Sequence, residues 1–228
     1  MEDRANTPNR ILDAARALFN QKGYAATTMA EIAKSIGISP GNLTYHFPSK
    51  RDLVVGLRAR TQAAMDARWR AKVAGAIADD YIEHLLFAIR LTWDIRFLLQ
   101  DHALLSDAGD SLENSPYMLS DYEELTELLQ RIEAEGLFRK ELSLDIEVLS
   151  SALWMNSRYW MDHLRELGTA TGAPWQDLEA GIRHHITLLG QFLKPKAKSE
   201  FESAMESALR FMKSFNYDAA SGTIPQIA

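Results

Sequence analysis

The sequence predicts an all-α protein, with a small helical domain at the N-terminus and a larger helical domain after it. Apolar residues recur every three to four positions in one segment after another, as they do along one face of a helix. Serine or threonine precedes several of these segments and glycine or proline follows them, so caps and stops divide the chain into helices. Neither a strand-like alternation nor an internal repeat stands out. We expect the two domains to cover residues 1–57 and 58–228.

The first predicted helix starts at Thr7 and Pro8 and stops at Gly23. Threonine is a good N-cap, and proline suits the first helical position because its missing N–H would have no partner there. The apolar stripe of this helix consists of Ile11, Ala14, Ala15, Leu18 and Phe19. We expect Tyr24, directly after the glycine, to pack back against the helices.

Two short helices with a tight turn between them follow. Thr28 can cap the first, and Glu31, three residues later, completes a capping box. Gly37 stands where this helix should stop, because glycine enters the left-handed backbone region freely. Ser39 and Pro40 then begin the second helix. A helix, a short turn with a glycine and a second short helix form the helix-turn-helix pattern.

The second of these short helices has one apolar face. Leu43 and Phe47, four residues apart, form the face that we expect to point inward. Its other residues carry hydrogen-bonding groups and lie mostly off that face: Asn42, Thr44, Tyr45 and His46. Basic residues flank the helix: Lys34, Lys50 and Arg51. Such a helix suits the major groove of DNA, where base edges present donors and acceptors.

A fourth helix should begin after Ser49, which can cap it with Asp52 in the capping-box position. It continues through Leu53 and Leu57 toward Trp69. Three packed helices with this fourth one leading out would make a compact N-terminal domain.

The charge distribution agrees with DNA binding at the N-terminus. Residues 1–60 contain nine Lys or Arg and five Asp or Glu, whereas residues 61–228 contain sixteen and twenty-six. The N-terminal part therefore carries +4 in a chain whose net charge is -6. A basic N-terminal domain on an acidic body fits a protein that approaches DNA phosphates with one end.

The composition is that of a globular protein, with 46% hydrophobic and 25% charged residues among 228. The chain has no cysteine, which excludes disulfides and thiolate chemistry. The first ten residues are polar and show no signal peptide, and no apolar run reaches the ~18 residues of a membrane helix. We therefore expect a cytoplasmic protein.

The segment from about Arg10 to Leu57 resembles the N-terminal domain of the TetR (tetracycline repressor) family of bacterial transcriptional regulators. The resemblance lies in AARALF, KGY, TTM-x-EIA, GIS-x-GNL, YHFPSK and DL, spaced as in that family. It implies an all-helical homodimer whose variable C-terminal domain binds a small ligand and then lowers operator affinity. We therefore expect a ligand-responsive transcriptional regulator, in this family most often a repressor, which binds a palindromic operator and is released by a small-molecule effector.

The same resemblance implies a set of residues that contact DNA: Thr28, Ser39, Gly41, Asn42, Thr44, Tyr45, His46 and Lys50. Thr28 and Lys50 would contact backbone phosphates. Thr44, Tyr45 and His46 would touch bases and phosphates. Thr44 departs from the family pattern, where this place is often aromatic, which leaves the operator sequence open. Two other interpretations also stay open: Tyr45 could be partly core, and His46 could cap the carbonyl groups of its own helix.

Helical segments predicted in the larger domain cover residues 81–100, 116–136, 146–167, 178–193 and 199–215, the last of them capped by Ser199. In the family, the penultimate helices form a four-helix bundle between two subunits, and residues 146–167 and 177–193 are the candidates here. A dimer is also expected because one short helix reads too few base pairs for useful specificity.

A cavity for a small molecule would lie between the helices of about residues 80–160. Aromatic and methionine side chains are candidates for its lining: Trp93, Phe97, Tyr117, Met118, Tyr122, Trp154 and Tyr159. Polar side chains are candidates for anchoring the ligand: Arg96, His102 and Asn156. Apolar residues at this spacing are more often ordinary core, which is the alternative for each of them.

The sequence gives no indication of a catalytic site. It lacks a phosphate-binding glycine loop, an HExxH zinc motif and a GxSxG nucleophile elbow. Three adjacent pairs are interpreted as solvated helix faces, caps or interface residues: Asp79-Asp80, Glu123-Glu124 and His184-His185. We expect no cofactor and no bound metal. The remaining alternative is a helical protein–protein interaction module without sequence-specific DNA binding.

Overall fold

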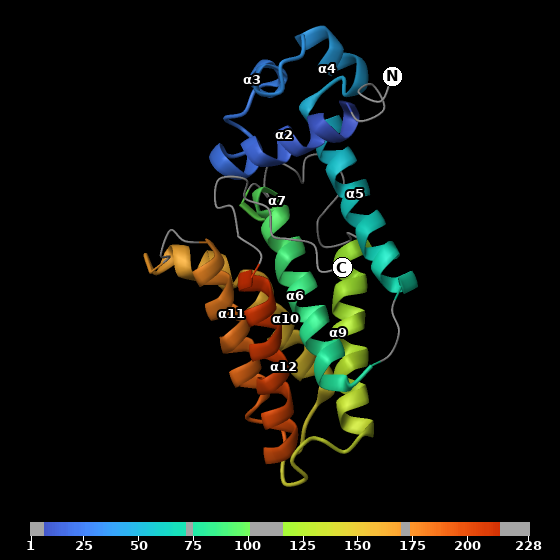
Figure 1. Ribbon diagram of the computed structural model, residues 1–228, viewed down its shortest axis with the longest axis vertical. Coiled ribbons are helices and arrows are strands. Elements are labelled where there is room, and N and C mark those ends of the chain that lie inside the picture. The colour runs from blue at the N-terminus through green and yellow to red at the C-terminus, as the bar shows by residue number, and fades with distance from the viewer. Residues whose placement is uncertain (1–6, 72–74, 101–115, 170–173, 215–228) are drawn as a thin grey trace. The chain divides into compact units, whose positions relative to one another are not determined.

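The computed structural model describes residues 7–71, 75–100, 116–169 and 174–214. In these parts of the chain the regular structure is helical, so the predicted all-α fold is confirmed. Phe138 and Leu193 form an isolated antiparallel bridge. The chain divides into two compact units, whose helices are labelled in Figure 1.

The first unit comprises residues 1–72 and 93–118. Its helices are α2 (Thr7–Lys22), α3 (Met29–Ser35), α4 (Pro40–His46), α5 (Lys50–Ala71) and α7 (Arg96–Gln100). Helix α2 packs against α3, α5 and α7, and α3 packs against α4 (Figure 1).

The apolar stripes of the first three helices meet in one core. The side chains of Ile11, Phe19, Ile32 and Leu43 are all 0% exposed. The ring of Tyr24 lies 5.3 Å from that of Phe19, so the expectation that it packs back on the helices is confirmed.

A tight turn joins α3 to α4. Gly37 adopts a φ of +69°, a left-handed backbone conformation that L-residues with a side chain rarely take up. The predicted stop at this glycine is therefore confirmed. The turn leaves α3 and α4 packed together as a helix-turn-helix.

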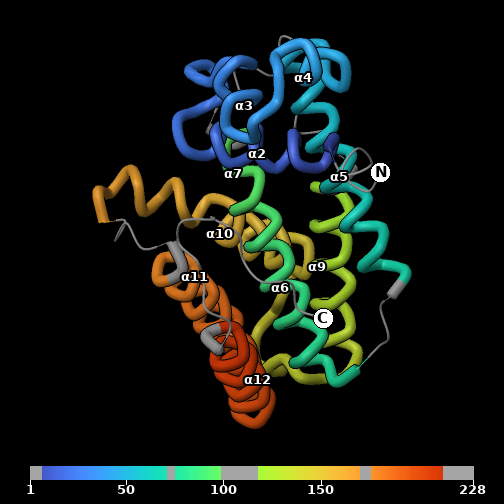
Figure 2. Tube along the Cα trace, turned by 45° about the horizontal axis from the view of Figure 1, so that its top comes forward, coloured from blue at the N-terminus to red at the C-terminus, as the bar shows by residue number. Residues whose placement is uncertain are grey.

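The second unit comprises residues 73–92 and 119–228. Its helices are α6 (Ile77–Asp94), α9 (Pro116–Ala134), α10 (Ile146–Glu166), α11 (Pro174–Leu189) and α12 (Pro195–Ser214). The last two residues of α6 and the first three of α9 belong to the first unit. Helix α11 packs against both α10 and α12, and α6 runs beside α9 (Figure 1, Figure 2).

Helices α10 and α11 approach closely where Trp160 meets Gly181. A Cβ atom at position 181 would lie 2.6 Å from the indole ring of Trp160, so a side chain there would push the two helices apart. The indole N–H of Trp160 donates to the carbonyl oxygen of Asp177 at 2.8 Å. This contact fixes the pairing of the two helices.

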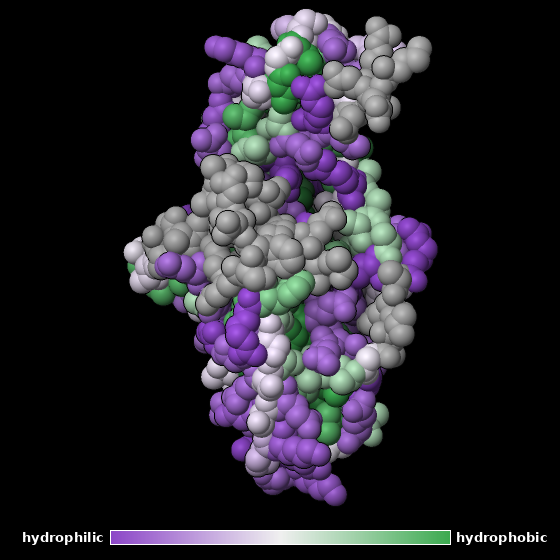
Figure 3. Space-filling view, viewed as in Figure 1, coloured by the Kyte–Doolittle hydropathy of each residue, from purple (hydrophilic) through white to green (hydrophobic). Residues whose placement is uncertain are grey.

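The surface of the described chain is mainly polar on the face shown in Figure 3, where apolar residues form small, separate groups. This agrees with the burial of the apolar stripes inside each unit. No helix in the described ranges is long and apolar enough to cross a lipid bilayer.

Several of the predicted helix boundaries are wrong. The segment expected as one helix over residues 81–100 is two, because α6 ends at Asp94 and α7 begins at Arg96. The last helix begins at Pro195 and not after Ser199. Proline lacks an N–H that the first turn of a helix leaves without an internal partner, so Pro195 suits the start of this helix. The helix expected over residues 178–193 begins earlier, at Pro174, and ends at Leu189, before Pro195 is reached.

Candidate DNA-binding interface and effector domain

Thr28 begins α3 with a complete capping box. Its hydroxyl oxygen accepts from the N–H of Glu31 at 3.2 Å, and its own N–H and O–H donate to Oε2 of Glu31 at 2.9 and 2.8 Å. The ammonium group of Lys22 donates to the other carboxylate oxygen at 2.5 Å. The bond from Lys22 and then those from Thr28 lower the pKa of Glu31 to about 2. This carboxylate is therefore charged at neutral pH and occupies the donors of Thr28.

Helix α4 begins as the sequence predicts and is anchored by one residue. The side chain of Ser39 accepts from the N–H of Asn42 at 3.1 Å, and Pro40 occupies the first helical position. Leu43 is 0% exposed and holds the helix against the core. Phe47 ends the helix and is half-buried. The opposite face of α4 is left to the solvent.

Tyr45 and His46 lie together at the end of that open face. The side chain of Tyr45 is 82% exposed, so the alternative that it belongs to the core is wrong. Its ring meets the half-buried imidazole of His46 edge-on, with centroids 5.2 Å apart. The pair therefore presents one phenolic hydroxyl and one imidazole at the surface.

Thr44 and Gly41 also lie on the open face of α4. The hydroxyl of Thr44 can donate back to the carbonyl oxygens of Pro40 at 3.1 Å and Gly41 at 3.2 Å. With its proton directed into the helix, the side chain presents a methyl group and acceptor lone pairs outward. A Cβ atom at Gly41 would meet nothing within 4 Å, so packing within the fold does not require this glycine. A glycine here would instead allow the backbone of another molecule to approach the helix closely.

Lys50, at the start of α5, is held by the segment between α2 and α3. Its ammonium group donates to the carbonyl oxygen of Tyr24 at 2.9 Å and lies 4.5 Å from the centre of the Tyr24 ring. A second, longer bond of 3.4 Å reaches the carbonyl oxygen of Ala25. An ammonium group has three donors, and these two bonds use two of them. The predicted capping box of Ser49 and Asp52 places Lys50 at the first position of the helix.

The predicted ligand-binding residues are divided between the two units. Trp93, Arg96, Phe97 and Met118 belong to the first unit, and Tyr122, Trp154, Asn156 and Tyr159 belong to the second. His102 lies outside the described residues, as does the side chain of Tyr117.

Within the first unit, these residues are mostly core. Trp93, Phe97 and Met118 are at most 8% exposed. The guanidinium of Arg96 lies 3.9 Å from the centre of the Trp93 ring and donates to the carbonyl oxygen of that residue. Phe97 packs its ring on Phe19 of α2, with centroids 5.1 Å apart.

Within the second unit, Tyr122 and Trp154 meet edge-on with ring centroids 6.0 Å apart. The hydroxyl of Tyr122 shares a hydrogen bond of 3.1 Å with Ser151. Asn156 is half-buried, and Tyr159 is 46% exposed on the outer face of α10. Tyr122 and Trp154 are thus neighbours, whereas Tyr159 points elsewhere.

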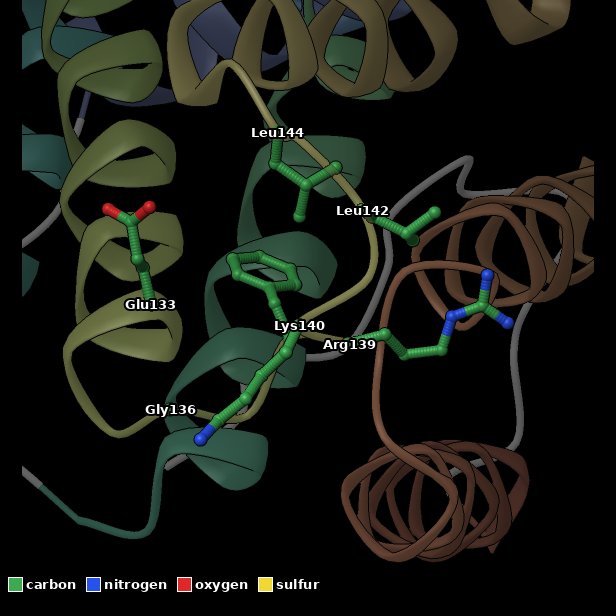
Figure 4. A pocket seen from close by; sticks show the side chains of 7 residues that line it. Glu133, Gly136, Arg139, Lys140, Leu142 and Leu144 are labelled. Carbon is green, nitrogen blue, oxygen red and sulfur yellow. The ribbon is translucent and has the colours of Figure 1, made fainter.

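A pocket of about 280 Å³ opens at the connection between α9 and α10 (Figure 4). It is lined by Glu133, Gly136, Phe138, Arg139, Lys140, Leu142 and Leu144. None of these residues is among those predicted to bind ligand.

The sequence interpretation missed a group of buried polar residues in the second unit. Their side chains are at most 7% exposed by residue: Tyr81 and His84 on α6, Glu124 on α9, Arg158 on α10 and His185 on α11. Asp80 of α6 is also buried, where it accepts from Arg131 at 2.5 Å and from the N–H of Gly75 at 3.0 Å.

One member of each adjacent pair is buried, so the interpretation of these pairs as solvated helix faces, caps or interface residues does not hold for that member. Asp79, Glu123 and His184 are exposed, and their neighbours Asp80, Glu124 and His185 are buried. Successive residues point about 100° apart around a helix, so two adjacent polar residues need not share a face. Buried ionisable residues of this kind often mark functional sites.

The capped α3, the glycine turn and the anchored, outward-facing α4 define a helix-turn-helix DNA-binding protein. Residues 11–57 match the profile described as bacterial regulatory proteins of the tetR family, and residues 60–201 match the TetR profile described as bacterial transcriptional repressor. The chain belongs to the TetR family. It is a DNA-binding transcriptional regulator.

Individual relatives agree with this assignment. The chain is 27% identical to the HTH-type transcriptional regulator UidR of Escherichia coli K12 over 155 residues, which cover 67% of this chain and 78% of UidR. A TetR-family regulator from Marinobacter aquaeolei VT8 has a similar fold, with a TM-score of 0.65, 21% identity, and coverage of 88% of this chain and 98% of that chain. A Saccharomonospora viridis regulator in complex with choline also gives a TM-score of 0.65, at 18% identity and 83% and 99% coverage.

Proposed function

We propose that this chain represses transcription as a homodimer on a palindromic operator, and that a small-molecule effector bound in the second unit releases it. The observation that carries the proposal is the division of α4 into an anchored and an open face. Leu43 is 0% exposed on one side, and Tyr45 is 82% exposed on the other. The fold thus fixes the helix without using the residues that would read DNA.

In the proposed complex, α4 lies in the major groove. Tyr45 and His46 contact base edges or phosphates through their hydroxyl and imidazole groups, and Thr44 offers its methyl group to a thymine. Gly41 lets the sugar-phosphate backbone approach the start of the helix, where Ser39 and Asn42 lie. Lys50 and Thr28 contact phosphates on either side of the groove. Such a protein acts in the cytoplasm, where bacterial DNA lies.

The outer face of α10 supports a dimer. Val148, Met155 and Tyr159 are 65%, 52% and 46% exposed, and their spacing of seven and four residues places them in one stripe along the helix. Helix α11, which packs against α10, adds Ala180 and His184, which are also exposed. A self-complementary surface of this kind pairs with its own copy about a two-fold axis, and the copies form a four-helix bundle.

Release by an effector requires that the ligand bind one state of the protein more tightly than the other. A coupling of about 1–3 kcal/mol between effector and operator is typical and would change operator affinity about 5- to 150-fold. The family assignment and the buried polar residues of the second unit support an effector site in that unit.

The test is a selection of bound duplexes from a random DNA pool, using the full-length purified chain at moderate salt. We expect a palindrome whose half-sites are separated by about one helical turn, or 10 base pairs. Binding should weaken steeply as salt rises, because phosphate contacts release counterions. If the folded protein enriches no sequence, or enriches only single half-sites, the proposed dimeric repressor is wrong.

A further inference from the structure

Helix α6 carries a histidine in the interior of the second unit. Among its residues up to Thr92, only Asp79 and Glu83 are exposed, so the helix is buried nearly all round. A helix in this position is usually apolar. His84 is nevertheless there, at 3% exposure, and it faces two carboxylates of α9.

The two carboxylates lie one turn apart on α9, with His84 between them. Nδ1 of His84 is 3.2 Å from Oε2 of Glu124, and Nε2 is 3.8 Å from Oδ1 of Asp121. Glu124 is 0% exposed, and the side chain of Asp121 is 15% exposed. Burying a carboxylate costs free energy unless a cation or several hydrogen bonds compensate for the lost water.

Hydrogen bonds compensate only partly for the burial of the Asp121 carboxylate. Its Oδ2 accepts from the indole N–H of Trp154 at 2.9 Å. Its Oδ1 is buried and accepts no hydrogen bond from any described residue. Burial raises the pKa of Asp121 and the carboxylate of Glu124 raises it further, against the lowering effects of His84, Trp154 and Arg158. An added positive charge here would therefore stabilise the carboxylate.

Arg158 is the fixed cation of this group, at 7% exposure. Its guanidinium carbon lies 5.4 Å from the centre of the Trp154 ring, which shows that the ring face accepts a cation. Its charge lowers the pKa of Asp121. We name Asp121, Glu124, His84, Trp154 and Arg158 together the His84 cluster.

The second buried histidine of this unit, His185, carries no charge at physiological pH. His185 is held between two hydroxyls, with Tyr81 at 2.8 Å from Nε2 and Ser157 at 2.6 Å from Nδ1. Burial first, and then the charges of His84 and His184, lower the pKa of His185 to about 3. His185 is therefore neutral at physiological pH and adds no positive charge to the His84 cluster.

We infer that the His84 cluster is the effector site and that it takes a small molecule with a protonated nitrogen. The ammonium group occupies the place between Asp121 and Glu124 that the imidazole of His84 fills in this structure. Its N–H groups donate to the two carboxylates, and its organic part lies against the rings of Trp154 and Tyr122. The inference deepens the proposed function, because it names the chemical class of effector that the second unit accepts.

The test compares amines with neutral molecules of the same shape, without DNA. Benzylamine and hexylamine are titrated into the full chain by calorimetry and thermal unfolding, and benzyl alcohol and hexanol serve as their uncharged counterparts. We expect each amine to raise the Tm with concentration and to bind at least about tenfold more tightly than its alcohol, as expected for hydrogen bonds to a charged partner. An equal effect of amine and alcohol would overturn the inference.

Substitutions of single carboxylates test where on the protein the amine binds. Asp121→Asn keeps the shape of the side chain and an acceptor for Trp154 but removes the charge, and should weaken benzylamine binding about tenfold or more. Glu124→Gln should act in the same direction. Glu123→Gln, which removes an exposed carboxylate from the same helix, should bind benzylamine like the unaltered chain. Amine binding that survives both buried substitutions would show that the cation lies elsewhere.

One measurement uses the unaltered chain and does not depend on the folding of a variant. The indole N–H resonance of Trp154 should shift on addition of benzylamine, because its acceptor Asp121 gains a new partner. Binding without that shift would contradict the assigned site. Because none of these readouts uses DNA, an amine site could be confirmed even if the operator selection failed, and the two proposals fail separately.

Discussion

The side-chain amide of Asn20 donates to the carbonyl oxygen of Asp94 at 2.9 Å. Its oxygen accepts from the N–H of Phe97 at 3.1 Å. Asp94 ends α6 and Phe97 lies in the first turn of α7, so one side chain of α2 bonds the backbone groups that both helix ends leave without internal partners. Arg16, one turn earlier on α2, adds an ion pair of 2.7 Å to Asp94. The helix-turn-helix is thereby joined to the break between α6 and α7 within the first unit.

Replacing Asn20 with alanine should destabilise the protein by about 1–2 kcal/mol, because two helix-end groups lose their partner. The free energy of unfolding in urea measures this. The same substitution should change how strongly an effector lowers operator affinity, since it loosens α2 from the end of α6. Gln21→Ala, at an exposed site on the same helix, is the control. Equal stability of the two variants would show that the Asn20 bonds contribute little.

Replacing Tyr45 with alanine should weaken binding to the selected operator by about 1–3 kcal/mol, or roughly 10- to 100-fold. The fold should be unaffected, because the side chain is 82% exposed. Fluorescence anisotropy with labelled duplex measures the affinity, and Tyr45→Phe separates the hydroxyl from the ring. Val55→Ala, which alters another exposed apolar residue, should bind normally. Full affinity and unchanged base preference in Tyr45→Ala would remove this residue from the interface.

Lys50→Ala should weaken binding to all DNA sequences about equally and reduce the slope of log affinity against log salt by about 1. It should also lower stability modestly, since the ammonium group ties α5 to the carbonyl oxygen of Tyr24. Operator and unrelated duplex are compared over a salt series. A loss confined to one base pair would mean that Lys50 reads sequence and does not contact phosphate.

Stability should fall as the pH is lowered from about 6.5 toward 3, because of His185. The unfolded chain binds a proton at the ordinary histidine pKa of 6.5, whereas the folded chain holds the pKa of His185 at about 3. The unfolded state therefore binds more protons in this window, and unfolding becomes easier by up to about 1.4 kcal/mol per pH unit. Urea unfolding at several pH values measures it. His185→Gln should flatten the profile, and His184→Gln should not.

Met155→Glu should dissociate the dimer, because it places a charge in the middle of the exposed stripe on α10. Sedimentation equilibrium then reports a monomer, and operator affinity falls since only one half-site is held at a time. Leu119→Glu changes an apolar residue of similar exposure on α9 and should leave the dimer intact. A Met155→Glu chain that still dimerises would place the interface on another face.

The sequence predicted the N-terminal helices well because their signals are local. A cap, a glycine and the spacing of Leu43 and Phe47 act within a few residues, and the structure confirms the caps at Thr28, Ser39 and Ser49. The buried half of Glu123-Glu124 could not be found in this way. Whether a carboxylate on α9 faces water or His84 depends on which helix packs there, and that partner lies 40 positions away in the chain.

The capping box of α3 has a consequence for how DNA would be engaged. Both donors of Thr28 are held by the carboxylate of Glu31, so the start of the helix already carries an anion before any phosphate arrives. A phosphate that reached Thr28 would exchange with this resident carboxylate and would release Lys22 from it as well. The step is an ion exchange within the protein. Its net free energy is the difference between the free energies with which Thr28 binds the phosphate and the carboxylate. The displaced Lys22 then becomes available to a second phosphate.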